Sequence, residues 1–83
     1  MYDLIYTEVV RKQLKKCDKD LQVRIISSLE RCRIRPYVHI KKIVGSKYYR
    51  LRVGDYRIIL NIVDEKLVIL VLELGHRKNI NIN

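Results

Sequence analysis

The period of apolar and polar positions changes once along the chain. After a short apolar segment at Tyr2–Tyr6, which predicts a first strand, apolar residues recur three to four positions apart as far as about Arg35. From Tyr48 onward they alternate with polar residues or form unbroken apolar runs, as they do in strands. The pattern therefore predicts a helical half followed by a β half.

Two helices are expected in the first half. Thr7 is a plausible N-cap for the first, and Asp18 or Asp20 can cap the second. The apolar positions are Val10, Leu14 and Cys17 in the first helix, and Leu21, Ile25, Leu29 and Cys32 in the second, with Ile26 beside them. Because Pro36 forbids continuation, the second helix should end before about Arg35. The pair would form a hairpin with one shared apolar side.

The second half predicts three strands: Tyr48–Val53, Tyr56–Val63 and Lys66–Leu74. Gly54-Asp55 and Asp64-Glu65 supply the turns between them. The last strand is apolar on both faces, as expected of a covered or central strand. The order β-α-α-β-β-β predicts an α+β fold, an antiparallel sheet with the helical hairpin packed on one face, in a single domain spanning residues 1–83. The place of the Tyr2–Tyr6 strand in this sheet stays open.

The charge of the chain is large and unevenly distributed. Lys and Arg total 18 against 9 acidic residues, a net charge of +9. The segment from Arg31 to Arg57 holds nine basic residues and one acid, Asp55. Such a charge favours polyanionic partners, such as nucleic acid, an anionic membrane or an acidic protein.

Other residue types exclude several kinds of protein. Two cysteines are too few for a disulfide framework, and the two histidines, His39 and His76, stand too far apart for zinc spacing, so we expect neither a metal nor another cofactor. The longest apolar run, Leu67–Leu72, is too short to span a bilayer. We expect a protein of the reducing cytoplasm with no membrane association.

The Gly54-Asp55 turn predicts which arginines meet. In a two-residue hairpin loop Arg52 faces Arg57 directly across the ladder, and Arg50 lies on the same face. Like charges in that position are destabilising, and a phosphate backbone would offset their repulsion. In an antiparallel meander, Arg77 should then approach Arg57 and Arg52. The alternative is a solvated surface on which arginine stems cover apolar atoms.

Tyr48 shares the arginine face by parity and could stack on a base, although tyrosines on half-buried strands more often fill the core.

The segments Tyr49–Ile59 and Gly75–Lys78 resemble the RelE/ParE superfamily of toxins from type II toxin–antitoxin systems. The Y-R-x-R-x-G-x-Y-R pattern and the G-H-R-K pattern carry the resemblance, which covers essentially the whole chain. It implies a RelE-like fold, related in shape to microbial RNases. It also implies a ribosome-dependent endoribonuclease that cleaves mRNA in the A site by metal-free attack of the 2′-hydroxyl.

The resemblance also assigns roles to residues. Arg57 and Arg77 match the catalytic arginines of the family, and Arg50 and Arg52 match basic positions that hold the substrate. Contacts to mRNA or to 16S ribosomal RNA would come from Lys41, Lys42, Lys47, Tyr48 and Lys78. The implied protein partner is a RelB-like antitoxin, in a toxin–antitoxin heterotetramer.

One departure concerns proton transfer. Many RelE toxins carry a tyrosine after the segment that matches Gly75–Lys78, but this chain has Asn79–Asn83, alternating Asn and Ile. Asn is no comparable acid or base. His76 could take that role, arginine electrostatics and ribosomal positioning could suffice, or the chain could be a weakly active or non-catalytic RNA-binding member. A ParE-like inhibitor of DNA gyrase is the other alternative.

Overall fold

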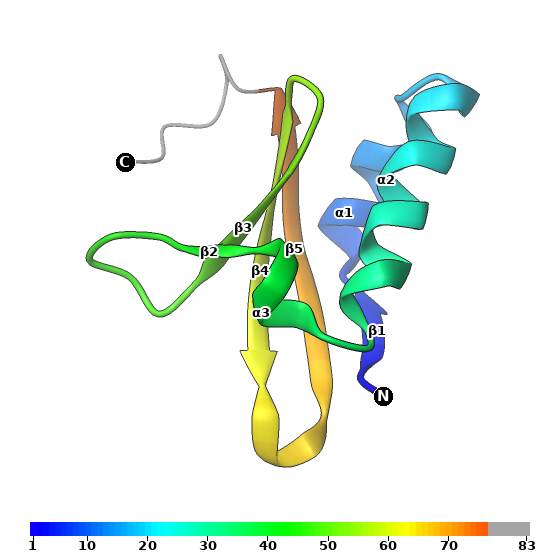
Figure 1. The fold of residues 1–83 in the computed structure, drawn as a ribbon. Helices are drawn as coiled ribbons and strands as arrows, with labels where there is room; N and C mark the ends of the chain where they lie inside the picture. The colour runs from blue at the N-terminus through cyan, green and yellow to red at the C-terminus, as the bar shows by residue number, and fades with distance from the viewer. Residues whose placement is uncertain (77–83) are drawn as a thin grey trace.

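The structure is a computed structural model that describes residues 1–76. Its two longer helices lie together on one side of a twisted sheet (Figure 1). The elements, in chain order, are β1 (Asp3–Tyr6), α1 (Glu8–Lys15), α2 (Lys19–Cys32), α3 (Pro36–His39), β2 (Lys41–Lys42), β3 (Tyr49–Val53), β4 (Tyr56–Val63) and β5 (Val68–His76). The predicted α+β fold is confirmed.

Both helices of the hairpin begin where the capping residues predict, whereas the first ends earlier than its apolar pattern indicated. The Thr7 side chain accepts a hydrogen bond from the Val10 amide at 3.3 Å, and Asp18 accepts one from the Leu21 amide at 2.8 Å. α1 ends at Lys15, so Cys17 lies just beyond it. Pro36 follows the end of α2 and opens the short helix α3, which the sequence pattern did not predict.

The sheet has the strand order β1-β5-β4-β3-β2. The neighbours β3, β4 and β5 are antiparallel, as predicted. The two-residue strand β2, which the sequence pattern did not predict, adds to β3 in the same sense. β1 joins the edge of β5 in parallel, with Ile5 opposite Leu70, which settles the position left open by the sequence and makes the sheet mixed. β5 lies between β1 and β4, so the central place predicted for it is confirmed.

The bounds of β5 differ from the prediction. A 3-10 turn at Asp64–Lys66 and a left-handed residue, Leu67, with φ of 53°, delay its start to Val68. The strand then continues through Gly75 and His76, which were expected to follow it. β3 likewise starts at Tyr49 rather than Tyr48.

The core lies between the helices and one face of the sheet. Leu51 pairs with Ile58, which pairs with Leu74, and all three are buried. Ile25 and Leu29 of α2 are fully buried against this cluster. Ile26 remains 40% exposed and lies outside the core.

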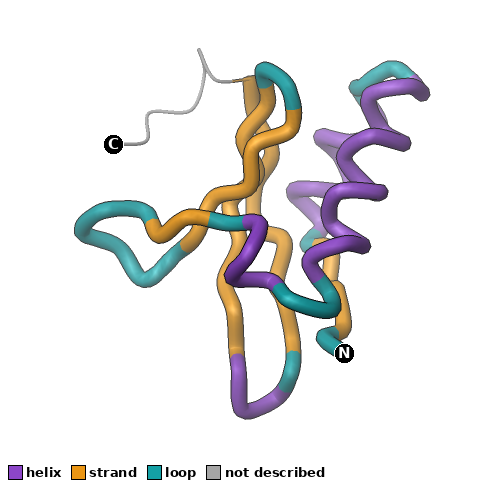
Figure 2. Tube along the Cα trace, viewed as in Figure 1, coloured by secondary structure: helices purple, strands orange, loops and turns teal. Residues whose placement is uncertain are grey.

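The opposite face of the sheet is not covered by α1 or α2. The segment between β2 and β3 extends away from the helices on this side (Figure 2). Among residues 1–76, no helix has the length and apolar character needed to cross a membrane.

Candidate nucleic-acid interface

Two arginines oppose each other on the uncovered face. Arg52 of β3 pairs with Arg57 of β4, and Arg50 pairs with Ile59 on the same face, as the turn predicted. Gly54 has φ of 58°, the positive value that a two-residue hairpin loop requires, and this turn fixes the register. Directly opposed like charges repel each other, so a bound anion between them would be favourable.

A hollow of about 170 Å³ lies beside these arginines. Its lining residues are His39, Lys41, Arg50 and Arg52. Lys41 pairs with Arg50 and therefore points to the arginine face. His39, at the end of α3, was missed by the sequence analysis. The sequence signal for His39 was its position two residues before Lys41, within the basic segment from Arg31 to Arg57. The hollow brings two guanidinium groups, one ammonium group and one imidazole together, which suits a phosphate.

Lys42, Lys47 and Tyr48 have different surroundings. Lys42 pairs with Tyr49 and places its Nζ 5.7 Å from the centre of that ring, on the helix-facing side. Lys47 extends over the ring of Tyr48 at 5.5 Å. Tyr48 itself precedes β3 and is half-buried. Of the expected RNA-contacting lysines that fall within residues 1–76, the structure thus brings Lys41 alone into the hollow.

His76 lies on the other face of the sheet from Arg57. It pairs with Tyr56, whose ring it meets edge-on at 5.3 Å between centroids. Tyr56 in turn pairs with Val53, a core residue, whereas the β5 partner of Arg57 is Gly75. Arg77 and Lys78, expected to complete the cluster, lie outside the described residues.

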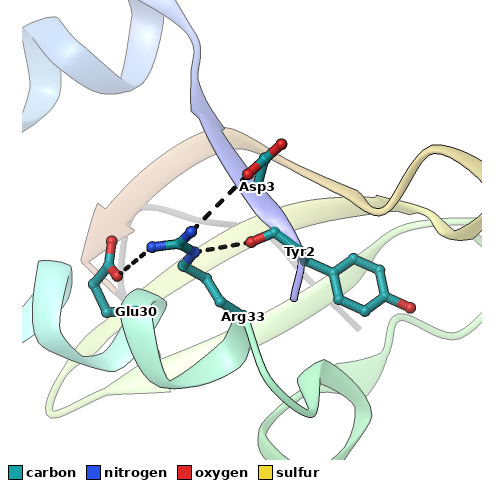
Figure 3. Close-up of polar contacts among 4 residues, drawn as sticks. All are labelled: Tyr2, Asp3, Glu30 and Arg33. Atoms are coloured by element: carbon teal, nitrogen blue, oxygen red, sulfur yellow. Dashed lines mark hydrogen bonds and ion pairs between the residues drawn. The ribbon is translucent and has the colours of Figure 1, made fainter.

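Arg33 shows what a structural arginine looks like in this chain. Its Nε donates a hydrogen bond to the Tyr2 carbonyl at 2.8 Å, and its Nη1 lies 3.0 Å from the Glu30 carboxylate (Figure 3). A third contact reaches Asp3 at 3.9 Å. In contrast, Lys41, Arg50 and Arg52 form no ion pair with any carboxylate among residues 1–76. Arg33 therefore ties α2 to β1, whereas Lys41, Arg50 and Arg52 are available to an external anion.

A carboxylate shared by two tyrosines holds α3 in place. The hydroxyls of Tyr2 and Tyr37 each donate a hydrogen bond of 2.7 Å to Asp64, in the turn between β4 and β5. These bonds lower the pKa of Asp64, while burial and the bond to Asp64 raise the pKa of Tyr37. Tyr37 also meets the Tyr49 ring edge-on at 5.5 Å. α3 is thereby fixed where His39 lines the hollow.

Cysteine and metal chemistry find little support in the described part of the chain. Burial raises the pKa of the Cys32 thiol to about 11, which keeps it protonated and unreactive at neutral pH. Within residues 1–76 no three His, Cys, Asp or Glu side chains gather in an arrangement that could hold a metal ion.

Comparisons with known proteins place this geometry among bacterial and archaeal toxins. Residues 4–81 match the family model of the ParE toxin of type II toxin–antitoxin systems, parDE. An Escherichia coli protein described as a RelE-like toxin is 29% identical over 80 residues, 93% of this chain and 84% of that protein.

Two solved complexes show the same likeness in three dimensions. A chain of the archaeal RelE–RelB complex from Pyrococcus horikoshii matches with a TM-score of 0.83 and 26% identity, over 95% of this chain and 98% of that one. A chain of the RelB–RelE complex from Methanococcus jannaschii matches with a TM-score of 0.72 and 30% identity, over 89% and 91%.

Proposed function

Because the chain belongs to the ParE toxin family of type II toxin–antitoxin systems, we propose that it arrests growth as an endoribonuclease that cleaves mRNA in the ribosomal A site. The observation that carries this proposal is the Arg52–Arg57 pair beside a hollow lined by Arg50 and Lys41. Lys41, Arg50 and Arg52 form no ion pair with a carboxylate among residues 1–76, so an anionic substrate explains their clustering better than solubility does.

The proposed chemistry needs no metal. The 2′-hydroxyl oxygen forms a bond to the adjacent phosphorus, and the bond from phosphorus to the 5′-oxygen breaks. A base removes the proton of the 2′-hydroxyl, and an acid supplies one to the 5′-oxygen, leaving a cyclic phosphate and a 5′-hydroxyl. Arg57, Arg52 and Arg50 would stabilise the negative charge that develops on the phosphate oxygens. Arg77 is proposed to join them, and Lys78 to contact the RNA backbone.

His39 is the better candidate than His76 for one of the proton transfers. It lines the same hollow as Arg50 and Arg52, while His76 lies on the helix-facing side beside Tyr56. An imidazole is the side chain best suited to exchange protons near neutral pH. His39 would thus take the role in proton transfer that a tyrosine has in related toxins, since this sequence lacks that tyrosine. RNA contacts by Lys42, Lys47 and Tyr48 would then flank the reacting phosphate rather than touch it.

A protein partner is part of the proposal. The solved relatives are RelB–RelE complexes, and a groove of about 470 Å³ on this chain is largely apolar, with Tyr6, Leu14 and Ile26 in its lining. Arg11, Lys15 and Glu30 border it, so an amphipathic antitoxin segment with acidic residues placed opposite Arg11 and Lys15 would complement it in both shape and charge. We propose a heterotetramer of two toxin and two antitoxin chains, assembled in the cytoplasm.

Primer extension on a translated mRNA after pulse expression tests the proposed reaction. The wild-type chain should give new cuts inside codons, while Arg52→Ala should remove them. Lys16→Ala is the control, because it deletes an exposed cation at the end of α1 that lines neither the hollow nor the proposed antitoxin groove. The Lys16 variant should still cut. Cleavage that persists in Arg52→Ala would overturn the assignment of the arginine face.

Inhibition of DNA gyrase is the second candidate, favoured by the family model, which describes toxins of parDE systems. That activity requires no cluster of cations around a reacting phosphate. It predicts an SOS response on expression, with the mRNA intact. Intact mRNA together with SOS induction would replace the endonuclease proposal.

A further inference from the structure

A second basic hollow lies where α2 passes the β3–β4 turn. It measures about 430 Å³. Its polar lining comes from Arg24, Ser27, Ser28 and Arg31 of α2, from Arg52 of β3 and from the backbone of Gly54. Of the residues that line it, Arg52 alone has a part in the proposed reaction.

The two hollows share one side chain. Arg52 lines both of them, so its guanidinium stands between the His39–Lys41 side and the α2 side. β2 has only two residues, opposite Tyr49 and Arg50, and it leaves the edge of β3 uncovered from Leu51 to Val53. The basic surface therefore continues around that open edge.

The turn residue allows the helix to approach the hairpin closely. A Cβ atom on Gly54 would lie 3.1 Å from Nη2 of Arg24, which is tighter than ordinary van der Waals contact. The absence of that atom lets the Arg24 guanidinium lie over the backbone of the turn.

The chemistry of the second hollow is that of an anion site. Three guanidinium groups and two hydroxyls line it, and no carboxylate does. Arg24 and Arg31 form no ion pair within the described residues 1–76. Guanidinium groups and hydroxyls are the side chains that most often bind phosphate oxygens of nucleic acids.

We propose that this hollow is a second phosphate-binding subsite, which holds the RNA backbone next to the segment that lies at Arg50 and Arg57. The inference rests on the proposed function for its ligand, a single RNA strand. Arg52 would contact the phosphate between the two subsites, and Arg24 and Arg31 would contact the next one along the strand.

The test is equilibrium binding of 2′-O-methyl RNA, which cannot be cleaved through its own 2′-hydroxyl, in strands of about four and about ten nucleotides. The wild type should bind the longer strand about tenfold more tightly, because it binds more phosphates. The double variant Arg24→Gln/Arg31→Gln should lack that advantage and keep its affinity for the short strand. Its salt slope on the longer strand should fall by about 0.7, because the variant no longer neutralises one phosphate.

The double variant Lys12→Gln/Lys16→Gln is the matched control, since it removes two exposed charges from α1 and its C-cap that line neither hollow nor the proposed antitoxin groove. It should keep the higher affinity for the longer strand. Ser27→Glu supplies an independent variant that retains both arginines, adds a repelling charge and suits a helix; it too should bind the two strands with similar affinity.

A preserved preference for the longer strand in the Arg24/Arg31 variant, or an equal fall in affinity for both strand lengths, would overturn the proposal. So would a variant that binds RNA normally and fails only to bind an acidic protein partner. Because these are binding measurements, a chain that shows the length effect but never cuts mRNA would overturn the proposed reaction and leave the second subsite standing.

Discussion

Alternate residues of β3 and β4 point in opposite directions, so the same two strands build two surfaces that can be compared directly. On the helix-facing side, Leu51 pairs with Ile58, and both are buried. One position further along, on the uncovered side, Arg52 pairs with Arg57. The first pair stabilises the fold by removing apolar area from water, whereas the second brings like charges together.

The difference shows which residues folding explains and which it does not. Every buried side chain of the core is apolar, and no polar or charged residue is buried among residues 1–76. Packing alone accounts for that face. Packing does not explain why Arg52 and Arg57 stand opposite each other on the other face. The two faces should therefore respond to substitution in opposite ways.

The largest effect is expected in the core. Leu29→Ala removes a side chain that is fully buried between α2 and the sheet. Such a change costs about 2–5 kcal/mol, through reduced burial and the cavity left behind. Urea unfolding should show this decrease in stability, and Ile26→Ala, at a position 40% exposed, should be far less destabilised. Equal destabilisation at the two positions would contradict the described core.

The β3–β4 turn should show the next largest effect. Gly54→Ala forces a Cβ into a backbone with φ of 58° and against Arg24, at a cost of about 1–2 kcal/mol. Gly45→Ala is the control, because Gly45 also has positive φ, 75°, but nothing lies within 4 Å of its added Cβ. Both variants should be less stable in urea, while the Gly54 variant alone should also bind RNA more weakly. An unchanged affinity would remove Gly54 and Arg24 from the binding surface.

A smaller effect of opposite sign is expected on the arginine face. Arg52→Gln ends the repulsion with Arg57 and should raise the free energy of unfolding by about 0.2–1 kcal/mol, while RNA binding weakens. Arg33→Gln should lower the free energy of unfolding, because Arg33 ties Tyr2 to Glu30. It should leave RNA binding unchanged. Urea unfolding and RNA titration of both variants measure this contrast. If Arg52→Gln proved as destabilising as Arg33→Gln, the open face would be structural after all.

The smallest effects concern pH. Hydrogen bonds from Tyr2 and Tyr37 lower the pKa of Asp64, so this group stabilises the fold above its unfolded pKa of about 3.9 and loses that contribution as the pH falls. The raised pKa of Tyr37 affects stability at alkaline pH. The Tyr37 hydroxyl contributes to the free energy of unfolding below about pH 10, and this contribution declines as the pH rises further.

Chemical unfolding across pH should therefore show a shallower acid loss of stability for Asp64→Asn. Tyr37→Phe should show a shallower alkaline loss, since the titrating hydroxyl is gone. Tyr2→Phe removes the other bond to Asp64 without touching α3, so it should leave the site at His39 undisturbed. Unaltered acid and alkaline profiles would show that the Asp64 hydrogen bonds are not formed in solution.

Local signals made parts of this fold predictable. Thr7 and Asp18 cap their helices as the sequence indicates, and the Gly54-Asp55 turn fixed the register that opposes Arg52 and Arg57. The resemblance to RelE/ParE toxins is confirmed by the family match over residues 4–81.

Features that depend on distant pairing were not predictable. The parallel pairing of β1 with β5 joins residues more than sixty positions apart, and no local pattern encodes it. The bonds from Tyr2 and Tyr37 to Asp64 are equally remote in sequence. Lys41 and Lys42 point to opposite faces of the sheet because β2 pairs with β3. A strand of two residues has no alternating pattern from which the sequence could have indicated this.

Cleavage of a programmed ribosomal complex by the purified chain tests the central claim most directly. With a defined codon in the A site, the wild type should cut the mRNA there and leave a cyclic phosphate on the upstream fragment. The Arg52→Gln variant should stay folded and fail to cut, while Lys16→Gln should cut like the wild type. Uncut mRNA with the folded wild type, or full cutting by Arg52→Gln, would contradict the account.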